Sequence, residues 1–394
     1  MSSTTRRALD AVYDYCRARN WTGDDPYDGL KSSVFNSIPL VRSNHAARLV
    51  QIQLFKRSPL NLRRLAGVEL SHNPKALGIF LSAASALHAI DLLPQYRDDA
   101  FRLASLLEDL RSEGCSGACW GYDFPWEGRG FSRPSYDPTV VATVFIANGF
   151  LDAWERFGET RFLDVARSAC DFVLNDLNRF GTPESFCFSY GPDDDGQVYN
   201  ASILGAQLLS RVAAATGEDD MMLTARAATR WVVGRQRDDG SWLYGEGPHQ
   251  QWMDSFHTGY VLVALADYID SSGDAEFTLS LEAGYDFYRS AFFDESGRPL
   301  SAPGKPLPLD TRNAAQGIIT HIRMGDVEAA DAVARWAIDT MRDPSGYFYY
   351  SKRRFGTIRI SYMRWCQAAM TVALAKLEEA RASSGRRHAE RGED

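Results

Sequence analysis

The stretch TVVATVFIANGFLDAWERFGETRFLDVARSACDFVLNDL, residues 139–177, decides the fold. Its apolar residues recur mostly at steps of three and four, which is the period of an α-helix with one buried face. Asp137 and Pro138 suit a helix start. Gly158 divides the stretch, because glycine ends a helix in the left-handed conformation and the acid after it suits the next helix start. The stretch therefore predicts two helices joined by a tight turn.

The same punctuation repeats along the chain. A glycine followed by an acid recurs at steps of 59, 56 and 52 residues, at Gly158, Gly217, Gly273 and Gly325. A second glycine falls between these marks at steps of 59, 57 and 49 residues, at Gly181, Gly240, Gly297 and Gly346. Periods of this size indicate an array of supersecondary units. The chain is therefore expected to repeat helix, tight turn, helix and long loop.

Counting these units predicts a closed ring. The expected helix pairs are 76–93 with 97–112, 139–157 with 161–177, 199–215 with 219–236, 256–270 with 275–292, and 312–323 with 326–342. The helix expected at 361–381 is the inner helix of a sixth pair. Its outer partner is the N-terminal helix at 4–18, which would close the ring. We expect an all-α fold, an (α/α)6 toroid of six inner and six outer helices, with a short β-hairpin at 348–360. It should form one domain over 1–381, with 20–70 as an N-terminal arm that holds a helix at 44–56, and a disordered tail at 382–394.

The composition is that of an ordinary globular protein. The chain has 394 residues, of which 45% are hydrophobic and 24% charged, and its net charge is −8. No basic stripe stands out, which argues against nucleic acid as a partner. Six cysteines show no disulfide framework, and CSGAC at 115–119 lacks partners at zinc-ligand spacing, so neither a metal nor another cofactor is expected. The apolar run at 76–93 is too short and interrupted to span a membrane, and no secretory signal is present, which favours a cytoplasmic protein.

The long loops should carry the function. In a ring of hairpins they all lie at one end, before the inner helices, and most of the tryptophans are in or beside them. The helix N-termini point unpaired amide groups into the resulting cup, which suits electron-rich oxygens. Flat aromatic walls with hydrogen-bonding groups favour a sugar, so an oligosaccharide or glycan precursor is the expected partner. The predicted wall residues are Trp120, Tyr122, Trp126, Tyr199, Asn200, Trp242, Tyr244 and Trp252.

Two pairs of residues are candidates for proton transfer. Asp254 and His257 are three residues apart at the start of an inner helix, so the acid can orient the imidazole. The alternative is a helix N-cap with a structurally satisfied histidine. Asp123 and Glu127 form a carboxylate pair among aromatic residues, and two carboxylates can divide acid and base roles. The alternative is that they cap turns or pair with Arg129.

Cationic and amide side chains in the same loops should hold anionic groups. Arg129, Arg312 and Arg364 are the expected anion contacts, and Gln316 and Tyr362 are further substrate contacts. Asp24, Asp25 and Asp28 indicate a turn, and the alternative is that they reach the cup.

Four strings carry a resemblance to a known group: DPYDGL (25–30), KRSPLNLRRLAGV (56–68), WGYDFPW (120–126) and WMDSFHTGYVLVAL (252–265). They resemble a family of bacterial proteins found with polysaccharide-biosynthesis genes. That family is similar to the six-hairpin (α/α)6 barrels of glycoside hydrolases, polysaccharide lyases and uronyl C5-epimerases. The resemblance implies a carbohydrate-active enzyme with acid–base chemistry at a glycosidic bond or at uronate C5, as a hydrolase, lyase or epimerase.

Two alternatives stay open. GRQRDDGSW at 234–242 resembles the glutamine–tryptophan motif of squalene and terpene cyclases, whose domains are also α/α barrels. The chain departs from that group because its acidic run at 193–195 lacks the D-x-D-D pattern. The other alternative is a glycan-binding scaffold without catalysis, which would share the aromatic cup but tolerate loss of the acids.

Overall fold

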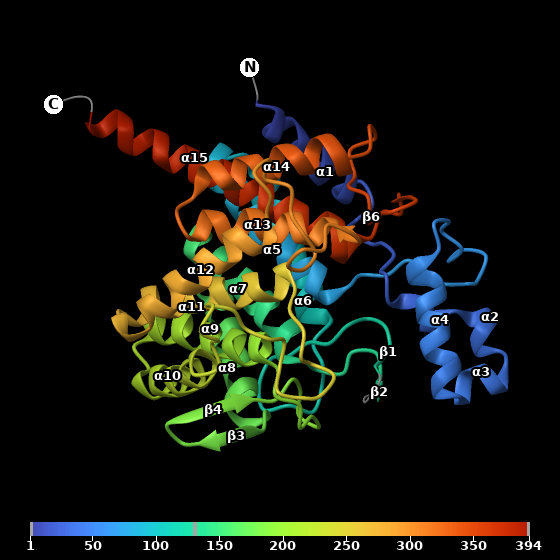
Figure 1. Ribbon diagram of the computed structural model, residues 1–394, viewed down its shortest axis with the longest axis horizontal. Helices are drawn as coiled ribbons and strands as arrows, with labels where there is room; N and C mark the ends of the chain where they lie inside the picture. Colours follow the sequence, from blue (N-terminus) through green and yellow to red (C-terminus); the bar gives the residue numbers. More distant parts are fainter. Residues whose placement is uncertain (1–2, 129–131, 392–394) are drawn as a thin grey trace.

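The computed structural model describes residues 3–128 and 132–391, and it contains the expected ring of helices (Figure 1). The inner helices are α5 (Pro74–Asp91), α7 (Val140–Phe157), α9 (Tyr199–Thr216), α11 (Ser255–Ser272), α13 (Thr311–Arg323) and α15 (Ala369–Arg391). Each packs against the next in this order, and α15 packs back against α5. The outer helices are α6 (Pro94–Asp109), α8 (Thr160–Asn175), α10 (Asp219–Val233), α12 (Thr278–Phe292), α14 (Val327–Met341) and α1 (Thr4–Arg17). Helix α1 packs on α15 and closes the ring, so the predicted (α/α)6 toroid is confirmed.

The predicted glycine turns end the inner helices. Gly158, Gly217 and Gly273 are the C-cap residues of α7, α9 and α11, with φ of 72°, 78° and 67°. Such left-handed angles strain any residue with a Cβ atom, which explains glycine at these repeated positions.

Small residues let the inner helices approach closely. Helix α5 is almost entirely buried and consists mainly of apolar and small residues. Where it crosses α7, a Cβ atom on Gly149 would lie 2.4 Å from the carbonyl oxygen of Gly78. An alanine there would force the two backbones apart.

Short antiparallel strands lie in the loops. The predicted hairpin is confirmed as β6 (Ser351–Arg353) and β7 (Gly356–Ile358), and β5 (Leu309–Asp310) pairs with β6. The sequence did not predict two further pairs. These are β1 (Trp126–Glu127) with β2 (Ser132–Arg133), and β3 (Arg179–Thr182) with β4 (Ser185–Phe188).

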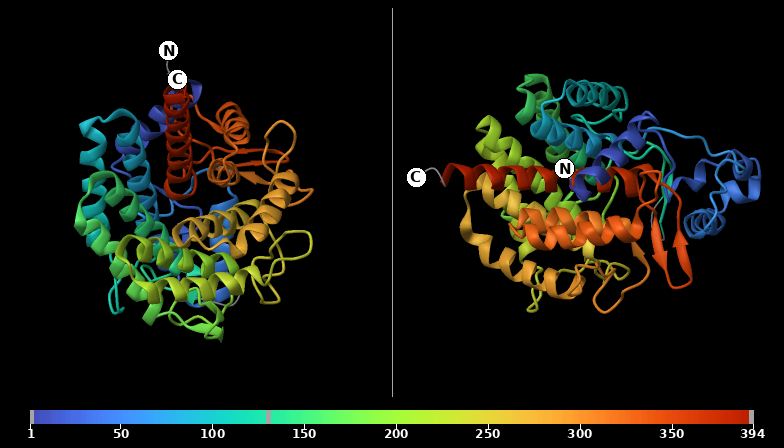
Figure 2. Two further views of the ribbon diagram at one scale, coloured as in Figure 1. Left: turned by 90° about the vertical axis from the view of Figure 1, so that its left-hand side faces the viewer. Right: turned by 90° about the horizontal axis from the view of Figure 1, so that it is seen from above.

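The arm, residues 20–70, forms a lobe at one end of the barrel (Figures 1 and 2). It holds a 3-10 turn at Asp28–Lys31 and the helices α2 (Ser33–Asn36), α3 (Pro39–Ser43) and α4 (His45–Arg57). Helix α4 matches the helix predicted at 44–56. At the other end of the chain, α15 runs to Arg391. The disordered tail from 382 stays a prediction from the sequence.

Within the described residues all six cysteines are free, and no group of three or more histidine, cysteine or carboxylate side chains could hold a metal ion. No helix in these ranges is both long enough and apolar enough to cross a bilayer.

Candidate active site

A cavity of about 220 Å³ lies where the N-terminal ends of the inner helices meet. All six inner helices contribute a residue at or near their start. The polar side chains of its wall are Lys75 from α5, Asn200 from α9, His257 from α11, Arg312 from α13, and Arg364 from the π-helical turn Met363–Ala368 before α15. The aromatic side chains of its wall are Tyr27, Tyr122, Phe124, Trp126, Tyr190, Tyr244, Trp252, Phe256, Tyr260 and Trp365. The ring therefore gathers residues from distant loops into one site.

Asp254 and His257 form a hydrogen-bonded pair at the cavity. Asp254 is the N-cap of α11, and its Oδ1 accepts a hydrogen bond of 2.8 Å from the backbone N–H of His257. Both carboxylate oxygens lie 2.9 Å from Nδ1 of the imidazole. Because an ionised carboxylate only accepts, Nδ1 carries the ring proton and Nε2 keeps a lone pair. The pair thus has the arrangement of an oriented general base.

Two basic side chains at the cavity, Lys75 and Arg312, form no ion pair among the described residues. The Nζ atom of Lys75 lies 3.7 Å from the centre of the Phe145 ring, and the guanidinium carbon of Arg312 lies 4.2 Å from that of Trp365. Among the described residues neither has a carboxylate oxygen within 4.0 Å, and Nε of Arg312 is buried without a hydrogen-bond partner. Burial, and then the charges of Arg312 and Arg364, lower the pKa of Lys75 well below its ordinary value. The site is therefore short of negative charge.

Arg364 differs because it is fully paired. Its Nε and Nη2 atoms bond the two carboxylate oxygens of Asp25 at 2.7 and 2.8 Å. Its guanidinium carbon also lies 4.8 Å from the ring centre of Tyr122. Asp25 thus fixes the arginine in the cavity wall. The loop of Asp24, Asp25 and Asp28, which was predicted mainly as a turn, therefore reaches the site through Asp25.

Two pairs of aromatic rings contact each other in the cavity wall. Trp252 is 41% exposed and stacks on Tyr244, with ring centres 4.4 Å apart and planes at 11°. Trp365 and Tyr27 contact each other with ring centres 5.5 Å apart. Such faces suit the apolar side of a sugar ring. The predicted wall residues Tyr122, Trp126 and Asn200 also line the cavity.

Two predicted wall tryptophans lie in the core instead. Trp120 and Trp242 are almost fully buried, and their indole N–H groups donate to the carbonyls of Leu107 and Val232 at 2.8 and 2.9 Å. Trp242 packs so closely on α12 that a Cβ atom on Gly284 would lie 2.6 Å from its ring. Both indoles fill space next to outer helices, so neither lines the cavity.

The carboxylate pair Asp123 and Glu127 does not face the cavity. Asp123 accepts hydrogen bonds from Lys31 at 2.9 Å, Ser71 at 2.5 Å and Asn73 at 2.5 Å. The carboxylate of Asp123 is thus hydrogen-bonded both to the arm, through Lys31, and to the segment before α5, through Ser71 and Asn73.

Glu127 is held from the arm in the same way. It accepts hydrogen bonds from Arg48 at 2.9 Å and Ser132 at 3.1 Å, and it lies 2.6 Å from Nδ1 of His45. Burial would raise its pKa, but the hydrogen bonds from His45 and Arg48 outweigh it and hold the pKa below its ordinary value. These contacts support the structural alternative for both acids, with partners on the arm. Arg129, the partner considered from the sequence, lies outside the described residues.

Three other predicted contacts lie elsewhere. Tyr199 packs edge-on against Trp231, with ring centres 5.5 Å apart, and Tyr362 is buried beneath Arg63. Gln316 lines a second cavity of about 490 Å³ on the far side of Tyr260 and Arg312, among the C-terminal halves of the inner helices.

Several wall residues were not predicted as site residues, namely Tyr27, Lys75, Phe124, Tyr190, Phe256, Tyr260 and Trp365. Lys75 left a usable signal, because it is the only charged residue in the first three turns of a helix that is otherwise apolar. Burying a lysine there costs free energy, so its presence indicates a function in the cavity.

Comparison with solved structures shows what the chain resembles. A cellobiose 2-epimerase from Bacillus thermoamylovorans superposes with a TM-score of 0.63 at 12% identity, covering 78% of this chain and 88% of the epimerase. A GH76 α-mannanase from Bacteroides thetaiotaomicron gives a TM-score of 0.61 at 13% identity, covering 80% and 88%. A D-mannose isomerase gives 0.59 at 10% identity, covering 79% and 87%.

The chain has the six-hairpin (α/α)6-barrel fold. No protein-family model matches its sequence, and no curated protein matches it significantly. The likeness to these six-hairpin barrels is therefore one of fold, and the chemistry must be argued from the cavity itself.

Proposed function

We propose that this six-hairpin barrel is a carbohydrate-active enzyme that moves a proton at the carbon beside the carboxylate of a uronate-containing sugar. The product would be the epimer or the eliminated, unsaturated sugar. One observation carries the proposal: the cavity wall combines an oriented imidazole, His257, with the guanidinium of Arg312 and the amine of Lys75, neither of them ion-paired, while no carboxylate lines it among the described residues.

The charge of the wall fits an anionic substrate. Among the described residues neither the buried guanidinium of Arg312 nor the buried amine of Lys75 has an acidic partner, and a substrate carboxylate would supply one. Binding of that carboxylate would also restore the ammonium form of Lys75, whose pKa burial lowers.

The same cations suit the chemistry. Removal of the proton beside a carboxylate places negative charge on the carboxylate oxygens, and fixed cations stabilise that charge as it develops. Nε2 of His257 would take the proton. Burial raises the pKa of Tyr190 and Tyr260, which keeps these phenols protonated and able to return a proton to carbon or to a leaving oxygen.

The other readings have less support. Hydrolysis of a glycosidic bond ordinarily uses two carboxyl groups that flank it, and neither Asp123 nor Glu127 reaches the cavity. A terpene cyclase would hold a carbocation among aromatic faces, and cations such as Arg312 and Arg364 would repel it. The solved structures of the same fold include an epimerase, an isomerase and a mannanase.

The test is incubation of the protein with uronate-containing oligosaccharides in heavy water, followed by mass spectrometry. Deuterium uptake without a change of chain length indicates epimerisation. Shortened chains with an ultraviolet chromophore indicate elimination. Both outcomes support the proposal.

Carboxyl-reduced oligosaccharides of the same length are the matched control. They keep every ring and hydroxyl contact but lack the anion, so they should bind weakly and exchange no deuterium. Hydrolysis without a chromophore, or equal turnover of the reduced sugars, contradicts the proposal. Binding without any exchange would instead favour the glycan-binding scaffold.

A further inference from the structure

The arm has a charge pattern unlike that of the remaining chain. Residues 31–68 contain seven lysines and arginines and no aspartate or glutamate, although the whole chain has a net charge of −8. Arg42 and Arg57 are exposed, and among the described residues neither has a carboxylate oxygen within 4.0 Å. The arm therefore presents unneutralised positive charge.

The arm also exposes apolar side chains. Of the fifteen exposed large hydrophobic residues in the described part of the chain, eight lie between residues 34 and 70. Leu40 and Leu65 are 73% and 83% exposed. On α4, Val50, Leu54 and Arg57 follow one another at steps of four and three, so one exposed face carries both apolar and cationic groups. Such a concentration marks an interaction surface.

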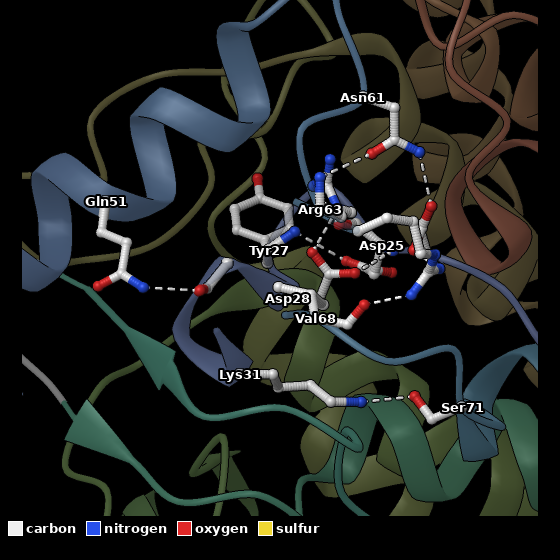
Figure 3. A network of polar contacts seen from close by, with 12 residues as sticks. Asp25, Tyr27, Asp28, Lys31, Gln51, Asn61, Arg63, Val68 and Ser71 are labelled. Atoms are coloured by element: carbon white, nitrogen blue, oxygen red, sulfur yellow. Dashed lines mark hydrogen bonds and ion pairs between the residues drawn. The ribbon is translucent and has the colours of Figure 1, made fainter. Parts of the chain in front are cut away.

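This surface belongs to a well-anchored lobe. Arg63 is fully buried, and it bonds the carboxylate of Asp28 and the carbonyl of Asp25, both at 2.6 Å (Figure 3). Gln51 of α4 donates to the carbonyl of Gly29 at 2.7 Å. The exposed leucines and valines are thus held outward by a fixed polar network beneath them.

The arm lies beside the cavity. Lys56 of α4 lies over the ring of Tyr27, 4.3 Å from its centre, and Tyr27 lines the cavity wall. A surface that binds the outer face of the arm would therefore lie near the mouth of the site.

We propose that the exposed apolar and basic surface of α2–α4 docks on an anionic lipid bilayer. Aliphatic side chains would enter the interface while Arg42 and Arg57 meet lipid phosphates. Charge favours this occupant over a second copy of the chain, because a symmetric dimer through the same surface would bring two positively charged surfaces together. The inference stands independently of the reaction in the cavity.

The test is flotation of the full-length protein with phosphatidylcholine vesicles, with and without phosphatidylglycerol. The bound fraction should rise with the anionic lipid and fall as salt is added, since screening weakens surface charge. The double variant Val50→Asn, Leu54→Asn should lower the ratio of bound to free protein by at least about ten-fold, because it removes apolar groups from the interface.

A matched control uses exposed leucines of the barrel. The double variant Leu223→Asn, Leu279→Asn changes residues on α10 and α12, with Leu279 77% exposed, and should leave flotation within about two-fold of the parent. Circular dichroism checks that both variants fold. No flotation at low salt, or equal flotation with and without phosphatidylglycerol, overturns the proposal. A dimer in vesicle-free solution that the arm variant alone converts to monomer would assign the surface to a second copy and overturn it too.

Discussion

Two pairs of residues in this barrel look alike in sequence and differ in structure. Asp254–His257 and Asp123–Glu127 both lie in aromatic loops before inner helices, and both were candidates for proton transfer. In the first pair the imidazole lines the cavity, and no described residue forms a hydrogen bond with its Nε2. In the second pair three groups contact each carboxylate, and neither carboxylate lines the cavity.

The difference lies in what remains unsatisfied. A side chain can act on a substrate only through an atom that the protein leaves available, such as Nε2 of His257. The carboxylates of Asp123 and Glu127 accept hydrogen bonds from the arm and from neighbouring loops, so we expect them to stabilise the structure. Variants at the two pairs should therefore separate activity from stability.

The largest effect is expected for His257→Ala. A positioned general base contributes about 10²–10⁴-fold, so turnover of the uronate substrate should fall at least about a hundred-fold while the helix content stays unchanged. The matched control is His249→Ala, which changes an exposed histidine of the preceding loop. Full activity in His257→Ala, or an equal loss in the control, would remove His257 from the mechanism.

Asp254→Asn should cost about a hundred-fold in turnover without weakening the fold. Asparagine caps a helix about as well as aspartate, so α11 keeps its N-terminus. Its amide can donate to Nδ1, however, which favours the tautomer with the proton on Nε2 and occupies the base. The measurements are turnover and the thermal midpoint of unfolding. A lowered midpoint with normal turnover of the folded protein would leave Asp254 as a cap only.

Lys75→Met should weaken the binding of uronate by about ten-fold or more, since a hydrogen bond to a charged group is worth about 1.5–3 kcal/mol. Methionine fills a similar volume without charge, so the variant should be at least as stable as the parent. Calorimetry with uronate and carboxyl-reduced oligosaccharides measures both affinities. Equal losses for the two ligands would mean that Lys75 shapes the cavity but does not recognise the anion.

The fold could be predicted because its signals are local. The turn at Gly158 and its repeats, together with the helical period between them, specify each hairpin from a few neighbouring residues. The β3–β4 hairpin was missed because Phe186, Cys187 and Phe188 of β4 are consecutively buried and show no alternation. A short apolar run of this kind does not distinguish a strand from a helix segment.

The loops that supply the site could be predicted from the repeat, and Tyr122, Asn200, Trp252, Arg312 and Arg364 from these loops line the cavity. The contacts between individual side chains could be predicted only for neighbours in sequence. Asp254 and His257 are three residues apart, whereas Lys75 and Trp365 meet only when the last inner helix closes the ring against the first. Trp120 lies in the expected loop but turns toward the core, because the carbonyl of Leu107 accepts its N–H. The direction in which a loop side chain points depends on the helices that flank the loop, and the local sequence does not specify these.

The smallest effect on activity is expected for Glu127→Gln, which should change the acid stability of the protein and leave turnover intact. Hydrogen bonds from the arm hold the pKa of Glu127 below its ordinary value of 4.5 in the folded protein. A depressed pKa contributes stability that is fully present above pH 4.5 and is lost as the pH falls through the lower, folded value. Glutamine has no such titration.

The difference in unfolding free energy between parent and variant should therefore be largest near neutral pH and shrink below about pH 4.5. Denaturant melts between pH 3 and pH 7 measure it, and Asp254→Asn is the comparison, since that substitution should act on turnover at every pH. If Glu127→Gln lowered turnover of the folded protein at neutral pH instead, the carboxylate would belong to the cavity chemistry. Such a result would contradict the difference proposed between the two pairs. Glu127 is the sharpest test of it, because Arg48, His45 and Ser132 contact its carboxylate on the side of the arm and of β2.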